Sequence, residues 1–103
     1  MKIPESVRIG GVEYTVTYAP DLNDGVNMLY GEINYDDCTI TLSETRGTAH
    51  EHRCLTLWHE ILHGIREHSC MEIEDEESVV DMFARGIYQV LQDNGRRFYD
   101  IAP

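Results

Sequence analysis

The chain has 103 residues, enough for one domain with one modest hydrophobic core, and its 19 acidic residues against 8 Lys and Arg give a formal net charge of −11. So acidic a surface repels phosphate backbones and anionic lipid, and we therefore expect neither a nucleic-acid partner nor a membrane partner. The charge can serve solubility alone, or it can mimic a nucleic acid and meet a basic partner.

The cysteines and the N-terminus point to a reducing compartment. Cys38, Cys54 and Cys70 are odd in number, widely spaced and without a CxxC pair, which argues against both a disulfide framework and a thiolate zinc site. The N-terminal segment has no apolar signal-peptide region, and no apolar run approaches the ~18 residues of a membrane span. We expect a cytoplasmic protein.

The first forty-odd residues have the pattern of strands. Gly10-Gly11 is a hairpin turn between two short apolar runs, and Asp36-Asp37 separates two more. In the second run, apolar and polar residues alternate with period two, as in a strand that is buried on one face. We expect four strands, at residues 7–9, 12–18, 28–35 and 38–43.

The second half has the pattern of two helices. Thr48 and Glu51 fit a capping box that starts a helix near residue 49, and this helix runs to about residue 67 or 68. The acidic run 74–77 opens a second helix, where negative charge suits the helix dipole, and Asn94-Gly95 ends it. The element order predicts an α+β fold, with a small antiparallel sheet of about four strands packed against two main helices in a single domain, residues 1–103.

Residues 59–63 form an HExxH motif within the first predicted helix. Histidines four apart lie one above the other on a helix, so His59 and His63 can bind one zinc ion. Glu60 lies about 100° around the helix, where it can take a proton from a metal-bound water. The pair falls at the rim of the helix's apolar face, and Glu60 lies further round toward the polar side. Two surface histidines on an ordinary helix are the alternative.

A catalytic zinc normally takes a third protein ligand. The extended metzincin motif is excluded because Arg66 and Ser69 stand where its glycine and third histidine belong. A glutamate from the next helix is the other common solution, and Glu77 fits it best, with Asp81 one turn later placed to orient a ligating histidine. His68 is the second candidate for the third ligand, and a helix-dipole role is the alternative for Glu77.

The segments LWHEILHGI and EESVVDMFARGIYQVL, joined by a short connection, resemble the compact gluzincin-type zincins over residues 48–94. They are most similar to the ImmA/IrrE-like metallopeptidases, which include short versions from phages and bacterial mobile elements. The resemblance implies a minimal zincin-like fold and one zinc ion per chain, held by His59, His63 and Glu77, with Glu60 as the base. It also implies a protein or peptide substrate, and the cytoplasm of a bacterium or a phage-infected host cell.

Two further features of the expected mechanism lie outside the motif. A substrate segment can add as a strand to a sheet edge, formed by residues 28–35 or 38–43. Tyr88 is a candidate to stabilise the transition state, and Tyr99 is another, although ordinary packing or surface roles are the alternatives for both. His50 and His52 are interpreted as surface histidines.

Three functions therefore compete. The first is a zinc-dependent metallopeptidase with a specific protein substrate, in which Glu60 activates the zinc-bound water. The second is a zinc-binding protein without catalysis, and the third is an acidic interaction or inhibitor protein of a phage or mobile element. Two histidines and a carboxylate also suit non-haem iron, but the glutamate within HExxH favours hydrolysis at zinc.

Overall fold

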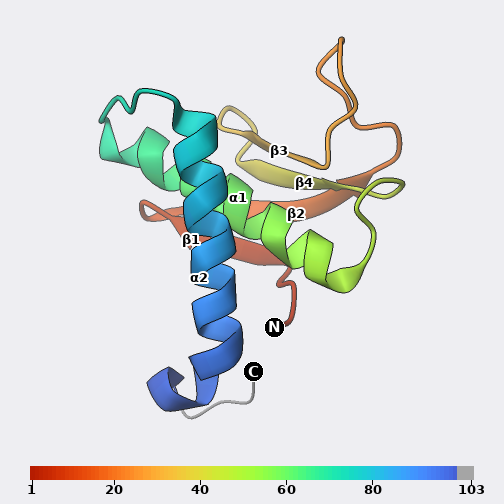
Figure 1. Ribbon diagram of the computed structural model, residues 1–103. Coiled ribbons are helices and arrows are strands. Elements are labelled where there is room, and N and C mark those ends of the chain that lie inside the picture. Colours follow the sequence, from red (N-terminus) through yellow and green to blue (C-terminus); the bar gives the residue numbers. More distant parts are fainter. Residues whose placement is uncertain (100–103) are drawn as a thin grey trace.

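The computed structural model describes residues 1–99, which form a sheet and two long helices (Figure 1). The elements in chain order are β1 (Ser6–Ile9), β2 (Val12–Ala19), β3 (Gly31–Asn34), β4 (Thr39–Ser43), α1 (His50–Ser69) and α2 (Glu76–Tyr99). The α+β class expected from the sequence is confirmed. Strand β3 is shorter than predicted, because residues 28–30 belong to the loop before it, where Met28 forms an isolated bridge with Asn23.

The sheet is mixed, which corrects the expected antiparallel arrangement. Its strand order is β1-β2-β4-β3, and β2 pairs with β4 in parallel while the other two pairs are antiparallel. The reason is the long connection after β2, because it leaves the position next to β2 empty for a later strand. Strand β3 then forms the outer edge, and the turn at Asp36-Asp37 returns β4 into the gap beside β2.

The core lies between the sheet and α1. The period-two alternation in β2 turns Tyr14 and Val16 inward, and Ile40 and Leu42 of β4 do the same. Leu57 of α1 packs against them from the opposite side. All five side chains are at most 9% exposed, so α1 is fixed firmly on one face of the sheet.

The helix ends differ from the sequence expectation. Helix α1 begins after Ala49, close to the predicted start, but no side chain caps its first turn, so the capping box of Thr48 and Glu51 does not form. It ends at Ser69, and the capping residue Cys70 adopts a left-handed conformation with φ of 59°. Helix α2 does not stop at Asn94-Gly95 but continues to Tyr99.

The three layers follow one another in order, from the sheet through α1 to α2 (Figure 1). Within residues 1–99, α2 packs on α1 and on none of the strands. Val80 and Ala84 supply the buried side of α2. None of the helices described is long and apolar enough to cross a membrane.

Candidate metal centre

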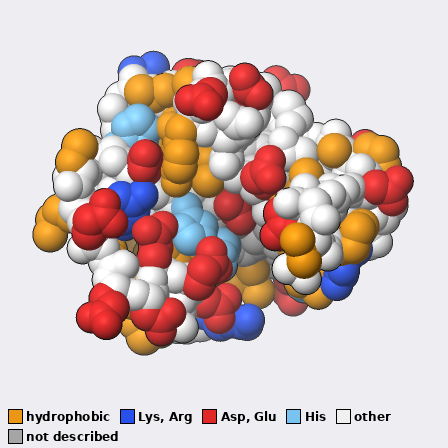
Figure 2. Space-filling view, turned by 90° about the horizontal axis from the view of Figure 1, so that it is seen from above, with side chains coloured by type: hydrophobic (Ala, Val, Ile, Leu, Met, Phe, Trp, Pro, Cys, Tyr) orange, Lys and Arg blue, Asp and Glu red, His pale blue; other side chains and the backbone are white. Residues whose placement is uncertain are grey.

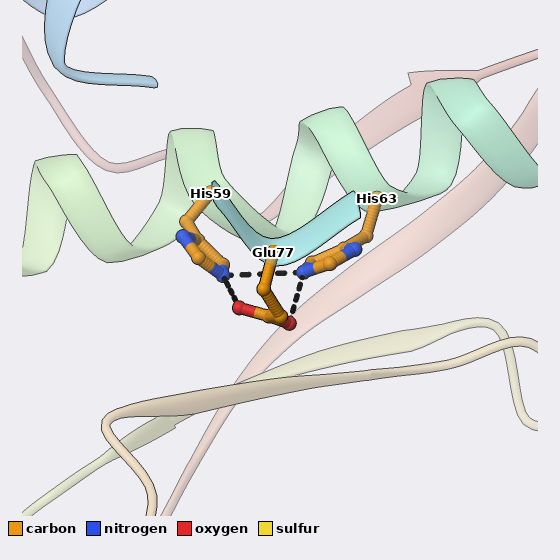
Figure 3. A group of neighbouring side chains, drawn as sticks. All are labelled: His59, His63 and Glu77. Atoms are coloured by element: carbon orange, nitrogen blue, oxygen red, sulfur yellow. Dashed lines mark hydrogen bonds and ion pairs between the residues drawn. The ribbon is translucent and has the colours of Figure 1, made fainter. Parts of the chain in front are cut away.

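Three side chains from the two helices meet at one point, His59 and His63 from α1 and Glu77 from the first turn of α2 (Figure 3). The Nε2 atoms of the two histidines are 3.1 Å apart. The carboxylate oxygens of Glu77 lie 3.2 Å from His59 Nε2 and 2.8 Å from His63 Nε2. The histidines are half-buried and Glu77 is exposed, so the cluster opens to solvent.

These distances suit a tetrahedral cation. Ligand atoms that surround a zinc ion at ~2.0–2.1 Å in a tetrahedron stand roughly 3.3 Å from one another. The two Nε2 atoms are 3.1 Å apart, and one ligand atom from each of the three residues lies within 4.8 Å of the others. Two imidazoles and one carboxylate are also a donor set that catalytic zinc uses. The residues present therefore fit a metal ion with at least one position left for water or substrate.

Glu76 holds His63 in the orientation that this role needs. Its Oε2 lies 2.5 Å from Nδ1 of His63, which donates a hydrogen bond to it. A proton on Nδ1 leaves the lone pair of Nε2 free to face His59 and Glu77. The hydrogen bond from His63 also holds the pKa of Glu76 below its usual value. The sequence analysis did not assign this role to Glu76.

Arg66 anchors Glu76 from the other side. Its Nε lies 2.7 Å from Glu76 Oε1, and its Nη2 lies 2.9 Å from a carboxylate oxygen of Glu67. One carboxylate of Glu76 thus bridges a guanidinium and an imidazole, each through a different oxygen. The role of orienting a histidine was assigned from the sequence to Asp81, whose Oδ1 lies 3.9 Å from Nδ1 of His59. That distance is too long for a direct hydrogen bond, and Asp81 pairs with Arg85 at 3.1 Å instead.

Glu60 is buried, with 7% of its surface exposed, although its helical position suggested the polar side of α1. Strand β3 covers it, and a Cβ at Gly31 would stand 3.5 Å from its Cγ. Desolvation, opposed by His63 and reinforced by Glu77, raises the pKa of Glu60 to about 7. A carboxyl group with a pKa near neutrality can both accept and return a proton, as a general base and acid must.

A cleft of about 600 Å³ runs between β3 and the two helices, and the cluster forms part of its wall. Glu60, Tyr30 and Arg85 also line it, and apolar side chains such as Leu55 and Ala84 line its interior. Histidine side chains are visible on this face among several acidic ones (Figure 2). The cleft therefore combines an apolar wall with converging polar groups, the usual composition of a small-molecule or peptide site.

The remaining sequence candidates lie elsewhere. Tyr88 contacts Cys54 near the start of α1 and is not among the described residues that line the cleft. His68 accepts or donates a hydrogen bond of 2.7 Å with the buried hydroxyl of Tyr14, so it serves the core. The side chain of Tyr99 lies outside the part of the chain that the structure describes.

His52 is not merely a surface histidine, because it lines the cleft and its ring lies 4.5 Å from that of Tyr30. His50 is exposed, and its Nε2 lies 2.6 Å from the carbonyl oxygen of Met1.

Sequence reasoning missed Tyr30, Arg85 and Glu76. For Glu76 the signal was present but ambiguous, since four consecutive acids precede or open α2 and the connection sets which of them meets His63. Tyr30 and Arg85 carried no signal, because only the packing of α2 and β3 around α1 brings them to the cleft.

A scan against protein-family models found no matching family, and searches of curated proteins and of solved structures found no significant match.

Proposed function

We propose that this protein is a zinc-dependent metallopeptidase, with zinc held by His59, His63 and Glu77. The observation that carries the proposal is the convergence of three ligand atoms from two helices beside a buried glutamate. The same cluster also fits a zinc-binding protein without catalysis. The buried Glu60 separates the two, because a desolvated carboxyl group costs stability and is typical of a group kept for chemistry.

A bound zinc ion would supply Lewis acidity, which lowers the pKa of water toward ~7 and polarises a peptide carbonyl. Glu60 takes the proton of the attacking water and passes it to the leaving amine. Its burial beneath β3 holds the carboxylate in place and excludes bulk water from it. Glu76 fixes the imidazole of His63 with Nε2 directed at the cluster.

The substrate segment is proposed to add to the outer edge of β3. Strand β4 pairs on both sides, so the second edge suggested from the sequence, residues 38–43, is not available. In the β3–β4 ladder, Ser43 donates to the carbonyl of Tyr30, which means that the backbone groups of Gly31 and Ile33 face away from β4. The amide of Ile33 already donates to Glu60, so the proposed strand pairing uses the amide of Gly31 and the carbonyl groups of Gly31 and Ile33. These groups line the cleft, so an extended peptide bound there runs past the ligand cluster.

Arg85 and Tyr30 take the place of Tyr88 as candidates to stabilise a developing oxyanion. Both line the cleft and both carry hydrogen-bond donors. Arg85 pairs with Asp81 and is largely exposed, so it can turn toward a bound substrate.

Metal content tests the ligand assignment. We expect wild type to retain about one zinc per chain by plasma mass spectrometry, His63→Ala and Glu77→Ala to lose it, and Glu60→Gln to keep it. Glu74→Ala is the matched control, since Glu74 is an exposed acid of the same run and lies outside the cluster. A wild type that neither contains nor takes up zinc would overturn the proposal and leave an acidic interaction protein.

Peptide cleavage tests the catalysis. Zinc-loaded wild type and Glu60→Gln are incubated with a library of unstructured peptides, and the products are identified by mass spectrometry. We expect cleavage by wild type and a loss of at least about 100-fold in Glu60→Gln, the usual contribution of a general base. If neither zinc-loaded protein cleaves the peptides above background, the non-catalytic alternative is favoured.

A further inference from the structure

The metal centre draws its ligands from two elements that are held in the protein to different degrees. Helix α1 supplies His59 and His63, and it is fixed on the sheet through Leu57, which is 1% exposed within the main core cluster. Helix α2 supplies Glu77 from its first turn, lies on the side of α1 away from the sheet (Figure 1), and contacts none of the described strands. The two histidines are therefore in place whenever the sheet and α1 are folded, whereas the third ligand is present only while α2 is docked.

Few apolar contacts hold α2 against α1. Over residues 76–98, the fully buried apolar side chains are those of Val80 and Ala84. Three larger apolar side chains of α2 are at least 41% exposed: Met82, Phe83 and Val90. Further along the helix, Tyr88 and Gln92 make single polar contacts with α1 and with the N-terminal segment. Because hydrophobic stabilisation scales with the apolar area that is buried, α2 is docked less firmly than α1.

The polar contacts at the first turn of α2 bring negative charge to the surface of α1. Glu76 bridges His63 and Arg66, and Glu77 lies beside both ligand histidines. Residues 72–77 contain five acidic side chains, and among the described residues Arg66 is the one Lys or Arg that forms an ion pair with them. Like charges are thus concentrated where α2 meets α1, and a divalent cation at the ligand cluster would offset them.

We propose that α2 undocks from α1 as one unit and that zinc, by binding Glu77 together with the two histidines, locks it in the docked position. This inference rests on the metal centre proposed above and describes how that centre is regulated. Undocking leaves zinc with the two histidine ligands of α1, so the docked state binds the metal more tightly. Docking and zinc binding are therefore linked, and each strengthens the other by the same factor.

Amide hydrogen exchange followed by NMR tests the linkage. Zinc at about 100 times its Kd is expected to slow the exchange of residues 86–94 by about 10–100-fold relative to protein in EDTA, because undocking then requires Glu77 to leave the metal. These residues lie more than two turns beyond Glu77, so a local effect at the ligand would not reach them. If mass spectrometry shows bound zinc and these amides are not slowed, the inference is overturned and the metal centre stands. A protein that takes up no zinc overturns both.

A matched pair of substitutions tests whether α2 opens separately from the rest of the fold. Val80 is buried where α2 packs on α1, Val16 is buried in the sheet core, and both are at most 9% exposed. In EDTA, Val80→Ala is expected to speed the exchange of residues 86–94 at least about tenfold. Val16→Ala should change that exchange less than about threefold and speed exchange in β4 instead. Equal acceleration of residues 86–94 by the two substitutions would show that α2 opens only when the whole protein unfolds, and would refute the inference.

Discussion

Replacing Glu60 by glutamine is expected to stabilise the metal-free protein at alkaline pH. Burial raises the pKa of Glu60 from 4.5 to about 7, so the folded state holds its proton more tightly than the unfolded chain. Stability from this group is present below about pH 4.5 and is lost as the pH rises through about 7. Each pKa unit is worth about 1.36 kcal/mol, so the charged carboxylate costs the folded protein about 3 kcal/mol at pH 8.

The glutamine side chain has nearly the same shape, and its oxygen can still accept the hydrogen bond that Ile33 gives to Glu60. Urea unfolding in EDTA should therefore show Glu60→Gln close to wild type at pH 4.5 and about 3 kcal/mol more stable at pH 8. Glu44→Gln removes an exposed charge and serves as control, with a change within about 0.5 kcal/mol at both pH values. A Glu60→Gln advantage that is absent, or equal at the two pH values, would refute the reasoning.

Three further outcomes are expected. Glu76→Gln should weaken zinc affinity by about 10–100-fold, and Asp81→Asn should weaken it less, because Glu76 lies within hydrogen-bond distance of His63 whereas Asp81 lies too far from His59. Zinc affinity is measured by competition with a chromogenic chelator, and equal effects of the two substitutions would contradict the assignment. Gly31→Ala should destabilise the fold by about 1–3 kcal/mol in chemical unfolding, since its Cβ would stand 2.5 Å from Cγ2 of Thr56, and unchanged stability would show that Thr56 moves aside freely. Free zinc at about 100 times its Kd should add about 2.7 kcal/mol to the free energy of unfolding, and no stabilisation would count against binding by the folded state.

The closeness of His59 and His63 was predictable because one helix contains both. Spacing within a helix is fixed by its geometry, so His59 and His63 needed only the correct assignment of residues 50–69 as helical. Glu77 came from a resemblance and from the position of the following helix. The distance from Glu77 to the histidines depends on the connection between the helices. In that connection Cys70 and Asp75 both adopt left-handed backbone conformations, which no sequence pattern predicted.

The burial of Glu60 and the parallel pair in the sheet were not predictable in the same way. Periodicity placed Glu60 toward the polar side of α1, but it does not say that a sheet edge will cover that side. Likewise the four strands were visible as segments, while their order depends on where the loop after β2 carries the chain. Both features are set by contacts between residues that are distant in sequence, which local patterns do not encode.

Because the fold is layered, the walls of the cleft differ in their free energy of local unfolding, and the wall formed by α2 is expected to open more easily than the wall formed by the sheet and α1. The main core cluster of the described residues is formed by the strands and α1, whereas Val80 and Ala84 of α2 are buried where α2 packs on the outside of α1. Amide hydrogens of α2 are therefore expected to exchange through smaller openings than those of β2 and β4, which report the global transition. Glu77 and Arg85 belong to α2, whereas Glu60 belongs to α1 and is buried beneath β3. A local opening of α2 would therefore move one wall of the cleft and leave Glu60 in place.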